Sequence, residues 1–136
     1  MKALRLLNLL RVREVLQHPP IRCKSFNINS SSEFNEKVMN STVPVVVNFH
    51  AEWCDPCHIL TPKLRELLES SEQVNLAIVD VESNADLVHT FEVKAVPAVI
   101  GIKDGLVIDK FIGLVEHDAI IKLVNKLLDH KFSKTK

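Results

Sequence analysis

The segment Trp53-Cys54-Asp55-Pro56-Cys57 is the most informative stretch of this chain. Two thiols separated by two residues can close a small disulfide ring and reopen it. Proline fixes φ and suits the first turn of a helix, so the segment predicts a helix that begins near Cys54. At a helix N-terminus, unpaired N–H groups and the helix dipole favour an anion. A thiolate forms more easily there, and the thiolate is the species that attacks disulfides.

Strands and helices are predicted on both sides of this segment. The β-branched run 45–49 precedes it and is typical of a strand buried on both faces. A helix is expected from Cys54 to about Glu69, with a kink at Pro62. Asp104-Gly105 between two apolar runs predicts a β-hairpin. The other expected elements are strands over 24–29, 74–81, 96–102 and 106–112, a helix opened by the capping-box pattern of Ser30 and Glu33, and helices over 85–91 and 119–128.

The predicted order of elements is βαβαβαββα. Helical crossovers imply parallel strands in the first half, whereas the hairpin adds antiparallel ones. The sequence therefore predicts an α/β fold with a mixed, five-stranded central sheet and helices on both faces.

Charge is divided unevenly along the chain. Residues 1–24 carry six basic side chains and one acidic one, a net charge of +5, whereas the remainder carries −5. A basic, acid-poor, Leu-rich start is typical of a mitochondrial transit peptide. We therefore expect a transit peptide over 1–24 and a single domain over 25–136, located in the mitochondrial matrix. A basic tail on a cytoplasmic protein is the alternative.

Other classes of function are disfavoured. The net charge of zero gives no indication of a nucleic-acid partner, and no apolar run approaches the ~18 residues that span a bilayer. Cys54 and Cys57 are the only close pair among three cysteines, and Cys23 lies in the expected transit peptide. Two cysteines cannot complete a Cys₄ zinc site, and the adjacency of Cys57 and His58 is not usual ligand spacing, so no metal site is expected.

Several motifs stand at characteristic distances from the two cysteines. They are Phe49-His50-Ala51-Glu52-Trp53-Cys54-Asp55-Pro56-Cys57, Pro62, Val96-Pro97, Lys103-Asp104-Gly105 and Phe111-Ile112-Gly113. In order and spacing they resemble the thioredoxin family over roughly residues 25–130, and C-x-x-C near a βαβ pattern is a known signature of that fold. His50 and the basic leader are most similar to the mitochondrial thioredoxins of animals.

The resemblance implies a role for each matching residue. Cys54 would be the attacking thiol and Cys57 the resolving thiol, the two forming a reversible disulfide. Pro97 would be a cis-proline beside the sulfurs, and the backbone of Val96 would pair with an extended substrate. Trp53 and Gly113 would line the substrate groove, together with the linker residues Asp55 and Pro56.

Three positions depart from the family pattern. Asn48 replaces a buried Asp that is proposed to move a proton for the resolving cysteine, and Asn cannot accept a proton at neutral pH. Asp55 should disfavour a thiolate at Cys54, whereas a protonated His58 should favour it, so these two modulators oppose each other. His50 follows a buried strand, which favours a packing role over proton transfer.

The sequence therefore predicts a protein-disulfide reductase that binds no cofactor and acts as a monomer. The resemblance implies recycling by an NADPH-dependent thioredoxin reductase, with peroxiredoxins among the clients. The alternatives are a binding module that uses the same groove with little turnover and a specialised thioredoxin with low general activity. The interpretation requires the two sulfurs to lie close enough to couple.

Overall fold

The computed structural model describes residues 24–129. The strands are β1 (Ser25–Ile28), β2 (Val45–His50), β3 (Asn75–Asp80), β4 (Ala98–Lys103) and β5 (Leu106–Ile112). The helices are α2 (Ser31–Phe34), continued by the π-helix η1 (Asn35–Met39), α3 (Asp55–Glu69), α4 (Ala85–Thr90) and α5 (His117–Leu128). The predicted order of elements is confirmed. Residues 1–23 of the expected transit peptide lie outside the described residues.

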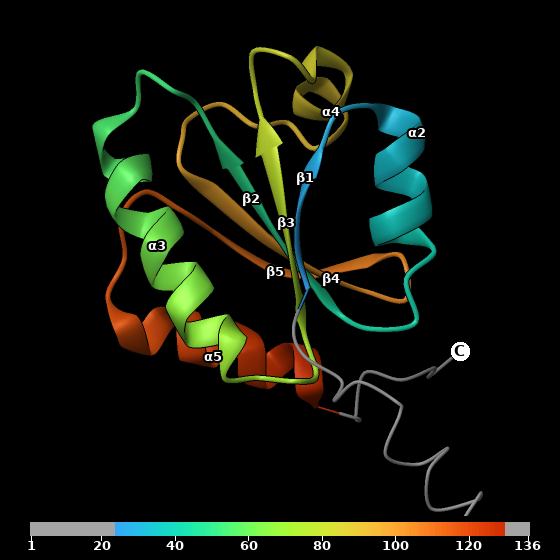
Figure 1. Cartoon of the computed structure of the whole chain (residues 1–136), viewed down its shortest axis with the longest axis vertical. Coiled ribbons are helices and arrows are strands. Elements are labelled where there is room, and N and C mark those ends of the chain that lie inside the picture. The colour runs from blue at the N-terminus through green and yellow to red at the C-terminus, as the bar shows by residue number, and fades with distance from the viewer. Residues whose placement is uncertain (1–23, 130–136) are drawn as a thin grey trace, which may run out of the picture.

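The five strands form one mixed sheet in the order β1-β3-β2-β4-β5 (Figure 1). β3 runs parallel to β1 and to β2, whereas β4 runs antiparallel to β2 and to β5. This is the predicted mixture, because crossover helices join the parallel strands and a hairpin joins β4 to β5. β2 is therefore the central strand, and its C-terminal end delivers the chain to the cysteine segment.

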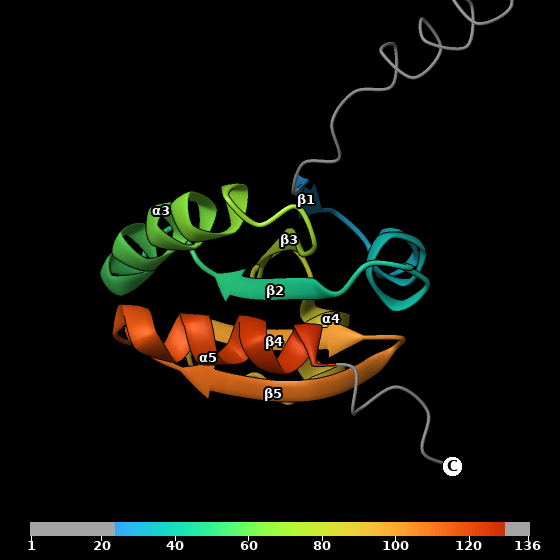
Figure 2. The same ribbon diagram turned by 90° about the horizontal axis from the view of Figure 1, so that it is seen from below.

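Helices cover both faces of the sheet, as predicted (Figure 2). On one face, Leu64 of α3 and Leu123 of α5 belong to the same apolar cluster as Val46 of β2. On the other face, Phe34 of α2 and Leu87 of α4 belong to a second cluster. β2 is thus packed between two apolar layers. These layers hold the end of the strand in place, where the cysteine segment begins.

The predicted helix cap and the predicted hairpin turn are both present. In the capping box, one hydrogen bond is shifted by a residue. The Ser30 hydroxyl oxygen accepts the N–H of Glu33 at 3.1 Å and so caps α2. The Glu33 carboxylate accepts the N–H of Asn29 at 3.2 Å, one residue before the N-cap that a capping box normally bonds. In the hairpin, Asp104 and Gly105 have φ of 51° and 74°, the left-handed values that a type I′ turn requires.

Two predicted boundaries are corrected. β4 begins at Ala98 rather than Val96, because Pro97 has no N–H to give to a strand pairing. The last helix begins at His117 rather than Ala119. Elsewhere, α3 continues on both sides of Pro62. Because β4 begins at Ala98, Val96 and Pro97 lie outside the sheet.

Candidate functional site

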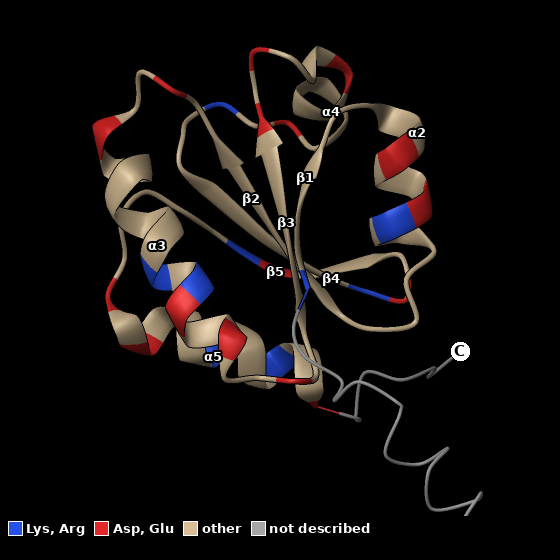
Figure 3. Cartoon of the chain, in the orientation of Figure 1, with Lys and Arg blue, Asp and Glu red and all other residues tan. Residues whose placement is uncertain are grey.

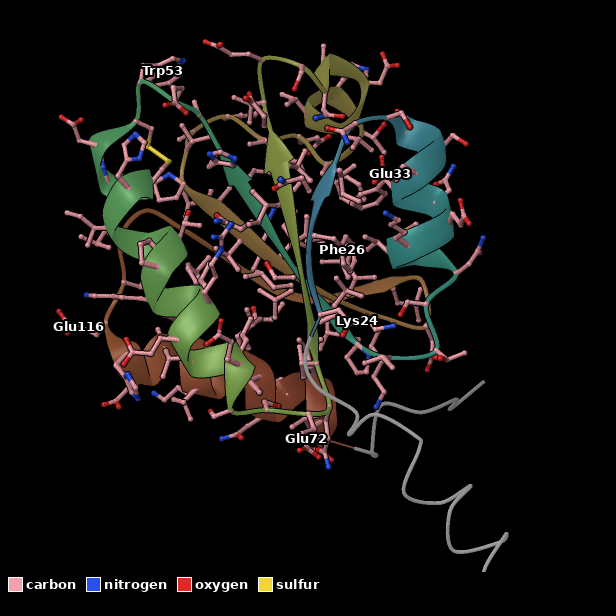
Figure 4. All side chains as sticks on the ribbon, viewed as in Figure 1. Lys24, Phe26, Glu33, Trp53, Glu72 and Glu116 are labelled. Atoms are coloured by element: carbon pink, nitrogen blue, oxygen red, sulfur yellow. A yellow bond between two sulfur atoms is a disulfide. The ribbon has the colours of Figure 1, made fainter. Side chains whose placement is uncertain are left out.

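The two cysteines lie where β2 leads into α3. Cys54 is the N-cap residue of α3, and its sulfur accepts the N–H of Cys57 at 3.2 Å. Asp55 and Pro56 begin the helix, as predicted. The sulfurs of Cys54 and Cys57 form a disulfide, with the Cα atoms 5.3 Å apart (Figure 4). The structure is therefore that of the oxidised pair, and after reduction the helix N-terminus favours a thiolate at Cys54.

Both cysteines are largely covered, but not equally. Cys54 is 4% exposed and Cys57 is 1% exposed. They cluster with Ala51, and the partly buried Val81 and Val96 pack against them. Cys54 is thus the more accessible of the two. A molecule that reaches it must dock closely against the surrounding surface.

Val96, Pro97 and Gly113 are brought together beside the cysteines. Val96 packs against the cysteine cluster, and the N–H of Gly113 donates to the carbonyl of Pro97 at 2.8 Å. Gly113 has φ of 91°, and a Cβ added there would meet no atom within 4 Å. Within residues 24–129, the backbone of Val96 makes no hydrogen bond. Its polar groups are therefore available to an extended segment laid along the site.

Trp53 is a large exposed aromatic residue at the same end of the molecule as the disulfide (Figure 4). The residue is 66% exposed, which excludes core filling. The indole Nε1–H donates to the Glu82 carboxylate at 2.7 Å. Because Glu82 follows β3, this bond ties the loop after β2 to the loop after β3. It fixes the orientation of an apolar surface on which a partner can rest.

The charged groups near the disulfide act in opposite directions. Acidic side chains lie in the loops that follow β2 and β3 (Figure 3), and Asp55 opens α3. These carboxylates disfavour a second negative charge nearby. The ring of His58 donates from Nε2 to the carbonyl of Glu52 at 2.7 Å. In the described part of the chain, neither Asp55 nor His58 forms a hydrogen bond with a cysteine sulfur.

Asn48 is completely buried in the middle of the sheet. Its Nδ2 donates to the Thr61 hydroxyl oxygen at 2.9 Å, and Thr61 lies one helical turn after Cys57 on α3. Among the described residues, no group donates to Asn48 Oδ1. Ile78 stands beside Asn48 in the β2–β3 register. The immediate neighbours are therefore uncharged, but one acceptor is unsatisfied, at a cost of about 1–3 kcal/mol.

Residues that the sequence did not assign to the site also gather here. A cavity of about 270 Å³ is lined by His50, Cys57, Thr61 and Arg65 among others. Residues two apart in a strand face the same side of a sheet, so the position of His50 relative to Asn48 already placed it on the α3 face. No comparable sequence signal marks Thr61 or Glu82, which reach the site from other elements.

Within residues 24–129, no three His, Cys, Asp or Glu side chains are grouped so as to hold a metal ion. None of the helices in that range is long and apolar enough to cross a membrane.

Comparison with known proteins gives consistent matches. The family model described as Thioredoxin matches residues 25–126. The mitochondrial thioredoxin of Mus musculus is 42% identical over 105 residues, which cover 76% of this chain and 63% of the mouse protein. The match thus spans less than two thirds of that relative's length. A probable thioredoxin-2 of Caenorhabditis elegans is 36% identical over 114 residues, 83% of this chain and 79% of the worm protein.

Solved structures show the same architecture. A mutant thioredoxin from Halobacterium salinarum superposes with a TM-score of 0.74 at 24% identity, covering 82% of this chain and 97% of the archaeal chain. At that identity the likeness establishes the fold alone. The predicted five-stranded fold with helices on both faces is confirmed.

Proposed function

The chain belongs to the thioredoxin family, and from this we propose that it is a thiol–disulfide oxidoreductase that reduces protein disulfides. One observation carries the proposal: the Cys54–Cys57 disulfide lies at the N-terminus of α3, beside the cis Val96–Pro97 bond. This places a reversible two-electron couple next to backbone that an extended peptide can bind.

The reaction proceeds in two exchanges of disulfide partners. The Cys54 thiolate attacks one sulfur of a substrate disulfide, expels the other substrate sulfur as a thiolate and forms a mixed disulfide. The Cys57 thiolate then attacks the Cys54 sulfur, which releases the second substrate sulfur and forms the Cys54–Cys57 disulfide. Each expelled thiolate takes a proton from solvent. The exposure of Cys54, greater than that of Cys57, supports this order.

The groove residues act on the substrate backbone and on its apolar side chains. The open N–H and carbonyl of Val96 pair with an extended segment, as in β-strand addition. Gly113 leaves the neighbouring wall without a side chain. Trp53, Asp55 and Pro56 contact the substrate from the other side of the sulfurs, and Asn48 and His58 modulate proton transfer.

We infer the partners and the location from the family and from residues 1–24. The oxidised chain is recycled by an NADPH-dependent thioredoxin reductase, and peroxiredoxins are among its clients. It acts as a monomer without a cofactor of its own. The basic, acid-poor residues 1–24 and the mitochondrial relatives support import into the matrix.

Reduction of insulin disulfides by the full chain with dithiothreitol tests the activity. Wild-type protein should turn over, Cys54→Ser should not, and Cys57→Ser should accumulate a mixed disulfide through Cys54 that mass spectrometry detects. Binding of disulfide-bearing clients without turnover above background would replace the proposal by a binding module. Consumption of NADPH with purified thioredoxin reductase tests the recycling partner separately.

A reporter fusion tests the location. Residues 1–24 fused to a fluorescent protein should enter mitochondria and be cleaved, whereas a cytoplasmic reporter of unchanged mass would contradict the transit peptide.

A further inference from the structure

His50 stands between two cavities at the end of β2. It lines the cavity of about 270 Å³ that also contains Cys57 and Thr61. It lines a second cavity of about 270 Å³, together with Asp80 and Ser83. Both are half-open pockets with room for several water molecules, since one water needs only about 10–15 Å³ of such space. The imidazole is therefore the one side chain that these two spaces share.

The second exchange of the proposed reaction needs a proton acceptor. Cys57 is 1% exposed, and a buried thiol does not ionise readily without a group that takes its proton. Asn48, the buried polar group nearest in the sheet to His50 on this face, cannot accept a proton at neutral pH. Its hydrogen bond goes to Thr61, which lines the same cavity as Cys57.

We propose that His50 accepts the proton of Cys57 through the first cavity and releases it to solvent through the second. Imidazole is the side chain best suited to gain and lose a proton near neutral pH. The inference rests on the proposed function, because a proton must leave Cys57 only if Cys57 resolves a mixed disulfide. His50 would thus accept the proton that the buried Asn48 cannot accept.

The charges around His50 fit a transient imidazolium. In the first cavity the other titratable and charged groups are Glu52, His58 and Arg65. In the second cavity Asp80 stands directly beside His50 in the β2–β3 register. The first cavity holds one carboxylate, of Glu52, and one guanidinium, of Arg65, whereas the second holds the Asp80 carboxylate, so the charge is more negative on the Asp80 side. The proton is thus drawn toward the Asp80 side.

The step balances as a proton transfer coupled to one exchange. The Cys57 S–H bond breaks, and its proton passes to the neutral imidazole of His50 by way of cavity water. The Cys57 thiolate attacks the Cys54 sulfur, the new S–S bond forms, and the bond from Cys54 to the substrate sulfur breaks. The substrate leaves as a thiolate, and the imidazolium then gives its proton to solvent on the Asp80 side.

Stopped-flow reaction with dithionitrobenzoate separates the two exchanges. The full chain is used reduced, in a Cys23→Ser background so that only the site thiols react. The first release of thionitrobenzoate reports attack by Cys54, and the second reports resolution by Cys57. His50→Gln should leave the first release unchanged and slow the second by roughly tenfold or more near pH 7, since general-base assistance contributes about 10²–10⁴. The rise of the second rate with pH should move to higher pH.

An unchanged second rate and pH profile in His50→Gln would overturn the inference. Absence of any second release in the wild-type chain would instead refute the proposed function, so the two failures are distinguishable. His89→Gln is the matched control, because it removes an exposed imidazole from α4 on the other face of the sheet. Adding Asn48→Asp to His50→Gln should restore a fast second release, which a purely structural defect would not allow.

A measurement on the unmodified site covers the case in which His50→Gln does not fold. The titration of the His50 ring is followed by NMR in the reduced and the oxidised chain. Proton sharing with Cys57 requires the midpoint of this titration to differ between the two states, and identical midpoints would overturn the inference.

Discussion

Asn48 and Thr61 form the polar contact on which the interior below α3 depends. The amide is completely buried, it donates to Thr61 from Nδ2, and within residues 24–129 its Oδ1 has no donor. A buried polar atom without a partner is costly, and a buried charge is costlier still. Substitutions at these two positions should therefore change the free energy of unfolding, and the introduction of a carboxylate should also change the rate of disulfide reduction.

Asn48→Asp should lower stability and speed disulfide reduction near neutral pH. Burial raises the pKa of the introduced carboxyl group, so the folded state binds more protons than the unfolded state and stability falls as pH rises. We expect a loss of about 1–3 kcal/mol in the free energy of unfolding at pH 7, and a smaller loss at pH 5. Urea titrations at both pH values measure the loss of stability. Insulin reduction at pH 7 measures the rate of disulfide reduction. Equal turnover in wild type and variant would refute the kinetic half.

Thr61→Val should destabilise the fold by about 1–3 kcal/mol, because it removes the acceptor of the buried Asn48 amide while keeping the shape of the side chain. Urea unfolding at pH 7 measures the effect. The matched comparison is Asn48→Leu, alone and combined with Thr61→Val. Since the two residues are direct partners, the double variant should lose less than the sum of the single losses. Strict additivity would show that the contact contributes nothing.

At the scale of elements, α5 is tied to β5 by one ion pair. Lys126 Nζ donates to Asp109 Oδ2 at 2.6 Å, and this hydrogen bond lowers the pKa of the Asp109 carboxyl below its ordinary 3.8. A depressed carboxyl pKa contributes stability above the unfolded value, and the contribution is lost as pH falls through the folded value. Both side chains are partly exposed, so the pair is screened by solvent.

Lys126→Gln should therefore lower the free energy of unfolding by about 0.5 kcal/mol at pH 7, and by nothing well below pH 3.8. Chemical unfolding at the two pH values measures the difference, and added salt should reduce it. Lys122→Gln is the control, because Lys122 lies on the same helix and forms no ion pair within residues 24–129. An equal effect of both variants would point to net charge rather than to the pair.

The elements themselves were largely predictable, because their signals are local. Ser30 and Glu33 marked a helix start, and Asp104-Gly105 marked a turn, through φ limits and hydrogen bonds that involve only near neighbours. The start of β4 was misplaced because Val96 is as apolar as a strand residue. Pro97 separates it from the sheet, because proline has no N–H to give to a strand pairing, and apolar periodicity does not take this into account.

At the scale of the whole molecule, the form with the Cys54–Cys57 disulfide should be more stable than the reduced form. The Cys54–Cys57 bond closes a ring over a sequence separation of 3, and such a cross-link restricts the unfolded chain. For so short a loop the entropy model gives about 2 kcal/mol in favour of the oxidised form. Thermal unfolding should therefore occur roughly 10 °C lower after reduction with dithiothreitol. The double variant Cys54→Ser/Cys57→Ser should show no such response, and coincident transitions for oxidised and reduced wild type would contradict the prediction.

The sequence by itself determined the dithiol at a helix start, the order of strands and helices, the hairpin and the two-sided core. These follow from side-chain periodicity and backbone limits within a few residues. Only the tertiary structure decided that Gly113 bonds to Pro97, that Trp53 is held by Glu82, and that His50 lies between two cavities. Such contacts join residues far apart in the chain, and they exist because the strand order β1-β3-β2-β4-β5 brings separate loops to one edge of the sheet.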